Sequence, residues 1–431
     1  MKKPCPCRPS HDCGITRRCE QDQAGRPATA GCAPSDAGRP TGPFTTLTAG
    51  RGLPAPPFAP VRRWVPPLHG IFAVVGKNGV RCSAEAPPRR FRWTFSLLLP
   101  VFGLILLLGQ SGCGTFVAHR ILQAPNTYPD WFAPSAPVTL DYDLKFLTNF
   151  PRQYVQVGPP AAQLCYRVIN PADYQVGVTS TNWLADGRRQ FKFTFHATVP
   201  GATNAWTAAP RGTVFLLHGY GLAQFSLAPW ALRLGQDGWR CVLVDLRGHG
   251  RSGGRQIYYG LRETRDLSQL LDQLGSNAPP ARPVVALGES YGGALALRWQ
   301  TVEPRLQSVV ALAPYASLSN SVLNIVHDYA GWLPKGLIRS GLRQVPVQLG
   351  VPAPELDTTT VLARHPVTAL FVAGGEDTIA PVADVTALER LAAPGSRLLI
   401  VPHATHEALT YYFDDLTAPV LAWLDATPQT N

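Results

Sequence analysis

One serine in the sequence has neighbours that suit nucleophilic catalysis. Ser290 lies in the pattern Gly-Glu-Ser-Tyr-Gly at residues 288–292, between an apolar run at 283–287 and a helix-like segment at 294–299. A serine on such a tight strand-to-helix turn adopts a strained backbone conformation that presents its Oγ above the sheet. The N-terminus of the following helix favours negative charge nearby. The pattern therefore predicts that Ser290 is a nucleophile.

A serine nucleophile needs a general base, and the base needs an orienting carboxylate, because the hydroxyl is a poor nucleophile at neutral pH. For this kind of turn the expected chain order is serine, then acid, then histidine. Two acids and two histidines downstream each follow an apolar run: Glu376 and Asp377 come after 367–373, and His403 and His406 come after 398–401. The order predicts a catalytic triad, with two candidates for the acid and two for the base.

Short apolar runs predict the elements that would position these side chains. Such runs occur at residues 213–217, 241–244, 283–287, 308–313, 367–373 and 398–401. Helix-like segments such as 261–274 lie between most of them. Buried strands that alternate with helices predict an α/β fold with a mostly parallel, doubly wound sheet. Ligands of such sheets bind beyond the carboxyl ends of the strands, which is where the candidate residues lie.

From about residue 212 to its end, the sequence resembles the α/β-hydrolase superfamily in its serine esterase and lipase-like branch. Residues 375–381, Gly-Glu-Asp-Thr-Ile-Ala-Pro, resemble the acid motif of that family, which favours Asp377 over Glu376. The family histidine usually heads the last helix after a short loop, which favours His406 over His403. The resemblance thus implies a triad of Ser290, Asp377 and His406.

Two further motifs fit the same family. Residues 216–221, Leu-Leu-His-Gly-Tyr-Gly, resemble its HGxG loop. The resemblance implies that the backbone N–H groups of Tyr220 and Tyr291 form the oxyanion hole, which stabilises charge that develops in the tetrahedral intermediate. Residues 245–252 match the DxRGxGxS turn of the family, whose polar side chains have structural roles. The family inserts a small cap at about residues 315–365, where this chain is rich in apolar residues that suit an acyl chain or simple packing.

The resemblance implies hydrolysis of a carboxylic ester, including lipid or acyl esters, through an acyl-enzyme on Ser290. The sequence has no flavin or dinucleotide fingerprint and no HExxH motif, so we expect no cofactor and no metal. Thioesterase, peptidase and acyltransferase activities use the same parts and remain open. A surface lipoprotein that keeps the fold as a non-catalytic binding module is a further alternative.

The positive charge of the chain is concentrated at its N-terminal end. The net charge is +11, and residues 1–92 hold 15 Lys and Arg against 5 Asp and Glu, which leaves 24 − 23 = +1 for the rest. A net charge near zero over the predicted domain argues against nucleic acid as a partner. Residues 1–92 also hold six of the nine cysteines, in spacings that fit no paired zinc knuckle, and read as low-complexity, disordered sequence.

A targeting signal is predicted after this basic segment. Three arginines at 89–92 precede the apolar run 93–108 and the sequence Gly-Gln-Ser-Gly-Cys at 109–113. This is the pattern of a secretory signal peptide over 93–112, and the run is short for a membrane span. Because a cysteine follows, it resembles a bacterial lipoprotein signal, which implies lipid attachment at Cys113 and an exported, membrane-anchored protein. A plain transmembrane anchor or an ordinary signal peptide is the alternative.

A signal peptide belongs at an N-terminus. Residues 1–79 are therefore hypothesised to come from a wrong start, with a non-standard start codon near Val80. A cytoplasmic tail is the alternative.

Residues 113–160 are expected to be a tether that packs on the domain, and residues 161–431 are expected to be the hydrolase domain. Segments 163–169 and 190–196 alternate apolar and polar residues and predict half-exposed antiparallel strands. Cys165 and Cys241 would allow a disulfide in an oxidising compartment.

Overall fold

The computed structural model describes residues 112–127, 138–142, 144–185, 187–200, 208–277 and 279–429. All of them belong to one of the two compact units of the chain, the one formed by Val65–Asn431. The predicted low-complexity segment 1–92 lies outside the described residues. So does all of the predicted signal sequence 93–112 except its last residue.

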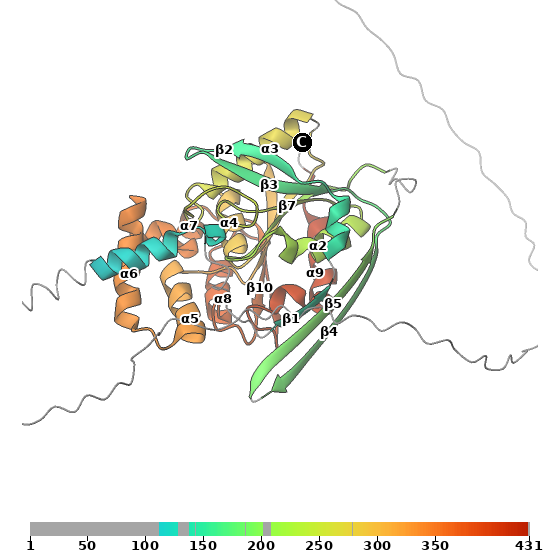
Figure 1. Ribbon diagram of the computed structural model, residues 1–431. Coiled ribbons are helices and arrows are strands. Elements are labelled where there is room, and N and C mark those ends of the chain that lie inside the picture. Colours follow the sequence, from blue (N-terminus) through green and yellow to red (C-terminus); the bar gives the residue numbers. More distant parts are fainter. Residues whose placement is uncertain are drawn as a thin grey trace, which may run out of the picture. The chain divides into compact units, whose positions relative to one another are not determined.

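The main sheet has eight strands in the described part of the chain, in the order β11-β10-β9-β8-β6-β7-β3-β2 (Figure 1). In chain order the strands are β2 (Gln153–Val157), β3 (Ala162–Ile169), β6 (Thr213–Leu217), β7 (Arg240–Val244), β8 (Val284–Glu289), β9 (Leu306–Leu312), β10 (Ala369–Gly374) and β11 (Arg397–Val401). Neighbours from β7 to β11 run parallel, whereas β2 and β3 are antiparallel. The prediction of a mostly parallel sheet is confirmed.

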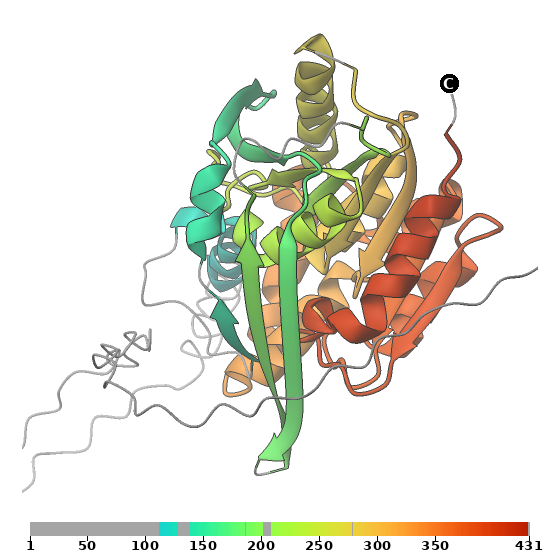
Figure 2. The same ribbon diagram turned by 90° about the vertical axis from the view of Figure 1, so that its right-hand side faces the viewer.

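Helices cover both faces of this sheet, because the central strands are apolar on both sides. The flanking helices are α2 (Ala228–Gln236), α3 (Glu263–Asn277), α4 (Tyr291–Gln300), α7 (Thr358–Arg364), α8 (Val382–Arg390) and α9 (Phe413–Ala426). Phe215 and Leu217 of β6 face a core shared with α3, α4, α7 and α8. Val214 and Leu216 face the other core, which is shared with α2 and α9. Figure 2 shows helices on both faces of the sheet. The fold is therefore doubly wound, as predicted.

A second sheet has the strand order β1-β5-β4, with β1 at Val138–Tyr142, β4 at Gln175–Ala185 and β5 at Arg188–Thr198. Strands β4 and β5 form a long antiparallel hairpin. Alternate residues of β5, Phe191, Phe193 and Phe195, are buried against the main body, as its alternating sequence predicts. Segment 163–169 forms most of β3, which pairs antiparallel with β7 as predicted. The expected half exposure is wrong for β3, because it lies between β2 and β7 and most of its side chains are buried.

The cap insertion lies between β9 and β10. It contains α5 (Leu318–Ala330), α6 (Lys335–Leu349), the 3-10 turn η4 (Ala353–Leu356) and then α7. The other 3-10 turns are η1 (Pro125–Thr127), η2 (Leu144–Asn149), η3 (Gln224–Leu227) and η5 (Leu409–Tyr411). Among the described helices, none is long and apolar enough to cross a membrane.

The segment expected to be a tether contains regular structure. Residues 112–122 are helical, and η1, β1, η2 and β2 follow before residue 160. Strand β2 forms the edge of the main sheet through its pairing with β3. Cys165 and Cys241 are both buried free thiols. Cys241 pairs with Ile169 in the sheet register, four residues along β3 from Cys165, so the two thiols are not joined.

Candidate active site

Ser290 occupies a sharp turn between β8 and α4. Its backbone has φ 50° and ψ −112°, a conformation that non-glycine residues rarely adopt and that stores strain. The flanking glycines leave no room for side chains: a Cβ on Gly292 would lie 2.0 Å from the carbonyl oxygen of Leu217, and one on Gly288 would lie 2.2 Å from that of Gly292. The Ser290 N–H donates to the carbonyl of Leu312 on β9. The turn thus fixes the serine at the carboxyl end of the sheet.

The structure brings Ser290, His406 and Asp377 together from three different strand ends. His406 Nε2 is 2.9 Å from Ser290 Oγ, and His406 Nδ1 is 2.8 Å from Asp377 Oδ2. The other carboxylate oxygen, Asp377 Oδ1, accepts the backbone N–H groups of Ile379 and Ala380. The Asp377 side chain is fully buried, so its orientation is fixed by these contacts. When His406 Nδ1–H donates to Asp377, Nε2 accepts the Ser290 hydroxyl proton.

The charges around His406 favour the protonated form of its imidazole. Burial alone lowers the pKa of His406, but the charge and hydrogen bond of Asp377 outweigh it, so that the pKa is raised above its ordinary value. An imidazole with a raised pKa accepts a proton from serine more readily. The site can therefore support general-base catalysis.

The alternative acid and base, Glu376 and His403, form a separate group. His403 Nδ1 is 3.2 Å from Glu376 Oε1, and Glu376 also makes a two-point ion pair with Arg189 of β5. His403 is 64% exposed. Arg189 lowers the pKa of Glu376. The structure therefore places this pair at the surface. Its third partner is Arg189, which binds the carboxylate, whereas the third partner of the other pair is Ser290, which contacts the histidine.

The residues predicted for the oxyanion hole line the same cavity as Ser290. Tyr291 is the first residue of α4, where a backbone N–H has no partner within the helix. Tyr220 lies three residues beyond the end of β6, next to the loop that begins with His218. His218 is fully buried and accepts the N–H of Leu246 at Nε2, and burial lowers its pKa to about 4. This neutral histidine supports the loop that carries Tyr220.

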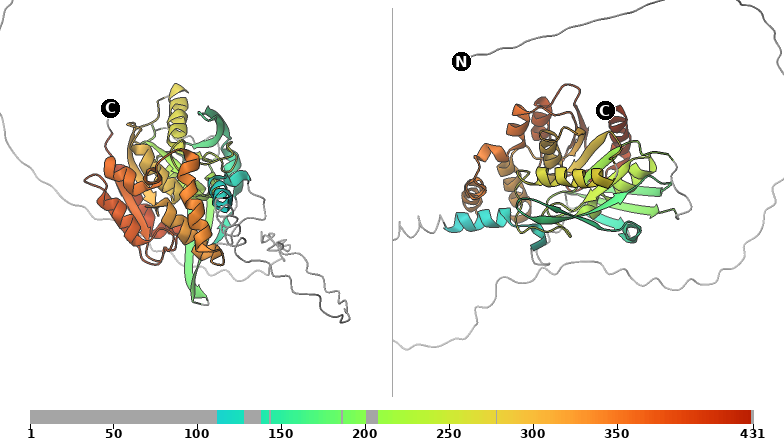
Figure 3. Two further views of the ribbon diagram at one scale, coloured as in Figure 1. Left: turned by 90° about the vertical axis from the view of Figure 1, so that its left-hand side faces the viewer. Right: turned by 90° about the horizontal axis from the view of Figure 1, so that it is seen from above.

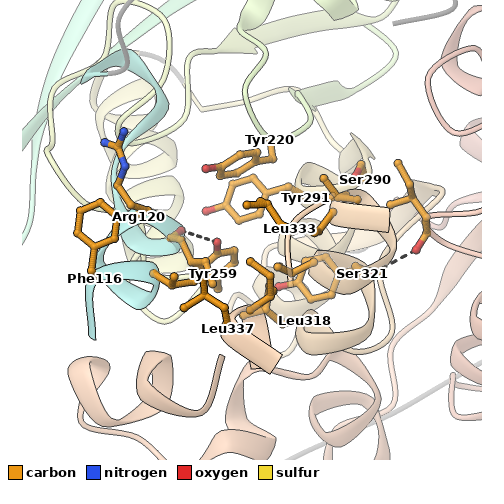
Figure 4. Close-up of a pocket in the computed structure, with 18 of the residues that line it drawn as sticks. Phe116, Arg120, Tyr220, Tyr259, Ser290, Tyr291, Leu318, Ser321, Leu333 and Leu337 are labelled. Atoms are coloured by element: carbon orange, nitrogen blue, oxygen red, sulfur yellow. Dashed lines mark hydrogen bonds between the residues drawn. The ribbon is translucent and has the colours of Figure 1, made fainter. Parts of the chain in front are cut away.

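A cavity of about 600 Å³ opens beside Ser290. Figure 4 shows Ser290 at one side of the cavity, with Leu318, Leu333 and Leu337 of the cap segment along it. Its lining is almost entirely apolar and aromatic, and it includes Tyr220 and Tyr291. The described residues that line it include no Asp or Glu. Such a volume and lining suit an apolar ligand of moderate size.

A protein-family model described as serine aminopeptidase, S33, matches residues 208–352. The match begins just before β6 and ends just after α6, and it contains Ser290 but neither Asp377 nor His406. The strand order, the turn at Ser290 and this match agree. The chain has the α/β-hydrolase fold. The predicted fold class is confirmed, and the match supports the resemblance to this superfamily.

Known proteins similar to this chain include a lipase and several esterases. A monoacylglycerol lipase from Mycolicibacterium smegmatis is 28% identical over 179 residues, which cover 39% of this chain and 58% of that lipase. An esterase from Pyrococcus furiosus is 19% identical with a TM-score of 0.47, over 68% of this chain and 98% of its own. Acetyl xylan esterase 1 from Thermoanaerobacterium sp. is 19% identical with a TM-score of 0.42, over 68% of this chain and 86% of its own.

The turn after β7 is held by buried polar contacts. Asp245 accepts hydrogen bonds from the N–H groups of Gln224 and Arg251, and Arg247 makes a buried two-point ion pair with Asp266 of α3. His249 is buried, and burial lowers its pKa to about 3. These contacts join the turn to a neighbouring loop and to α3, and none of them includes Ser290, which agrees with the structural role implied by the resemblance.

Sequence reasoning missed one residue of the site, Glu289. Glu289 occupies a variable position of the serine motif, to which the sequence assigns no role. Its carboxylate is buried and accepts hydrogen bonds from segments distant in the sequence. Its Oε1 accepts the N–H of Gly219 at 3.1 Å and the hydroxyl of Ser226 at 2.6 Å, and its Oε2 accepts the hydroxyl of Thr410 at 2.7 Å. Glu289 thereby fixes the loop that carries Gly219 and Tyr220 relative to the segment after His406. Its partners lie 63 to 121 residues away, so no local pattern signals them.

Within the described ranges, no three His, Cys, Asp or Glu side chains gather in a way that could hold a metal ion. The predicted lipid-attachment residue Cys113 is exposed and lies near the start of the helical segment 112–122.

Proposed function

We propose that this protein is a serine hydrolase that cleaves carboxylic esters of apolar acyl chains, with Ser290, Asp377 and His406 as its catalytic triad. The observation that carries this proposal is the continuous hydrogen-bonded series from Ser290 through His406 to Asp377 at the edge of an apolar cavity. The similarity to a monoacylglycerol lipase supports an ester as the substrate.

In the proposed mechanism Ser290 Oγ attacks the ester carbonyl while His406 Nε2 takes the hydroxyl proton. Asp377 stabilises the imidazolium that forms, because its carboxylate accepts the Nδ1–H. The N–H groups of Tyr220 and Tyr291 stabilise the oxyanion of the tetrahedral intermediate. The C–O bond of the leaving alcohol then breaks, and His406 returns the proton to that alcohol. Water, activated by His406, hydrolyses the acyl-enzyme and restores Ser290.

The lining of the cavity favours an ester over an aminopeptidase substrate. A peptide with a free N-terminal ammonium needs an anionic partner, because burying an unpaired charge is costly. The described lining residues supply no carboxylate, and their one charged side chain is Arg120, which repels an ammonium. Thioester hydrolysis and acyl transfer differ in the leaving group or the acceptor and would use the same acyl site.

The test combines covalent labelling with turnover. A fluorophosphonate probe should label the wild-type chain, and a series of p-nitrophenyl esters should be hydrolysed, whereas aminoacyl p-nitroanilides should not. Ser290→Ala should abolish both labelling and hydrolysis, and Ser276→Ala, a change on the surface of α3, should leave both intact. Absence of both labelling and turnover in the wild-type chain would support the non-catalytic binding module instead, whereas unchanged turnover in Ser290→Ala would show that Ser290 is not the nucleophile.

We also propose that Cys113 carries a lipid anchor, that the protein is exported, and that the membrane is its partner through this anchor. The basic and apolar pattern before Cys113 supports this proposal, as does the exposure of its side chain. Expression in a bacterial host with radiolabelled palmitate should label the wild-type chain and Cys82→Ser but not Cys113→Ser. Equal labelling of the chain with Cys113→Ser would exclude this anchor.

A further inference from the structure

The helical segment 112–122 lies against the cap. Figure 3 shows this helix, at the blue end of the colour scale, beside the orange helices of the cap. A Cβ on Gly341 of α6 would lie 2.3 Å from Val117 Cγ1, and one on Gly114 would lie 2.5 Å from Ser340 Oγ. A glycine on each helix therefore permits the close approach. The side-chain amide of Gln348 also donates to the carbonyl of Thr115.

The other end of the helix is fixed to the body of the domain. The Tyr259 hydroxyl donates to the carbonyl of Ile121 at 2.7 Å, and the N–H of Ile257 donates to the carbonyl of Leu122 at 2.9 Å. Ala118 and Leu122 are buried in the core that also contains α3 and α4. The helix is thus held at both ends, by the cap and by the domain.

One face of the same helix lines the cavity that contains Ser290. Phe116, Val117 and Ile121 contribute to this lining, although they lie about 170 residues before the serine in the chain. In Figure 4, Phe116 and Ser290 lie at opposite sides of the cavity. An acyl chain bound covalently to Ser290 therefore has room to extend toward the helix, between apolar walls.

We propose that helix 112–122 is the distal wall of the acyl-binding site and that Phe116, Val117 and Ile121 determine the length of the acyl chain that the enzyme prefers. The inference rests on the proposed ester hydrolysis. Each methylene that moves from water to an apolar wall strengthens binding by about fourfold. A substrate long enough to reach the helix gains this contribution, whereas a short ester does not.

Two changes on the helix test the wall directly. Phe116→Ala removes an exposed aromatic ring from the lining, and Ile121→Trp fills part of the cavity. Each should lower the ratio of kcat/KM for p-nitrophenyl dodecanoate over butyrate by about tenfold, a usual effect for altered apolar contacts in a pocket. His119→Ala, at an exposed position of the same helix outside the cavity lining, should leave the ratio unchanged.

A change on the cap tests the position of the helix. Gly341 does not line the cavity, but Gly341→Val places a side chain where Val117 lies and should shift the same ratio. The matched control is Gly336→Ala on the same α6, because a Cβ at residue 336 meets no atom within 4 Å. Circular dichroism of each variant establishes that it is folded.

The outcomes separate this inference from the proposed function. Loss of butyrate hydrolysis and of fluorophosphonate labelling in Ser290→Ala tests ester hydrolysis itself. If these are observed, but the dodecanoate-to-butyrate ratio stays within twofold of wild type in folded Phe116→Ala and Gly341→Val, the wall does not select the acyl chain and the inference is overturned. A shift of the ratio in these variants and not in the two controls supports it.

Discussion

Two pairs of carboxylate and histidine follow the last two strands of the main sheet, and they differ in what surrounds them. Asp377 and His406 are buried, and His406 contacts Ser290. Glu376 and His403 are one and three residues away in the chain, yet they lie at the surface with Arg189 as their third partner. The same two chemical groups thus make a candidate catalytic pair in one place and a surface ion cluster in the other. The two pairs therefore differ in their third partner, Ser290 or Arg189, and in the burial of their side chains.

The largest expected difference between the pairs comes from the histidines. His406→Ala removes the proposed general base and should lower kcat for a p-nitrophenyl ester by about 10⁶-fold, as loss of a triad histidine does elsewhere. His403→Ala should leave kcat within about twofold, because His403 does not contact Ser290. Steady-state kinetics of the two variants make the comparison, and equal losses would show that the two pairs are not functionally distinct.

The acids should differ by a smaller factor. Asp377→Asn keeps the shape of the side chain but no longer stabilises the imidazolium, and kcat should fall by about 10⁴-fold. Glu376→Gln disrupts only the contacts with Arg189 and His403 and should change kcat little. A large loss of activity in Glu376→Gln with full activity in Asp377→Asn would reverse the assignment of the acid.

Glu289 adds a third carboxylate to the comparison. It is buried like Asp377, but its hydrogen-bond partners are Gly219, Ser226 and Thr410 and not a histidine. Glu289→Ala leaves the N–H of Gly219 and the hydroxyls of Ser226 and Thr410 without their acceptor. If the loop that carries Gly219 shifts, kcat should fall by about 10²-fold, as for loss of one oxyanion donor, with KM little changed. Glu289→Gln retains an acceptor and should recover most of kcat, a rescue that loss of folding alone would not produce.

The smallest expected effect is on the pH dependence of kcat/KM. The pKa of His406 is raised above its ordinary value, and the base acts in its neutral form. The acid limb of kcat/KM should therefore lie above pH 6.5, with activity falling about tenfold per pH unit below it. Because the Asp377 charge and hydrogen bond raise this pKa, the limb measured with the residual activity of Asp377→Asn should move to lower pH. An unchanged limb would show that another group titrates.

The sequence predicted the strands well where each strand is apolar throughout. Thr213–Leu217 was predicted to the residue, and the runs for β8 and β10 were displaced by one or two residues. Buried parallel strands leave this signal because both of their faces are covered. The sequence also predicted the Ser290 turn. The turn leaves a local signal because Leu217 approaches Gly292 of α4 so closely that a side chain there would clash.

The wall of the cavity and the role of Glu289 were not predictable from local sequence. Residues 112–122 show no regular pattern of their own that points to Gly341 or Tyr259, which lie more than 130 residues away. The helix is positioned by those distant contacts, so it was interpreted as part of a tether. Long-range contacts of this kind fix the substrate-binding walls, whereas local motifs fix the nucleophile.

The most direct test of the account is the site and rate of fluorophosphonate labelling, mapped by mass spectrometry in the wild-type chain and in the two histidine variants. We predict one adduct, on Ser290, that forms at a near wild-type rate in His403→Ala and at least about 10³-fold more slowly in His406→Ala. An adduct on another residue, or a rate that is unaffected by His406→Ala, would contradict the assignment of Ser290, His406 and Asp377 as the catalytic triad.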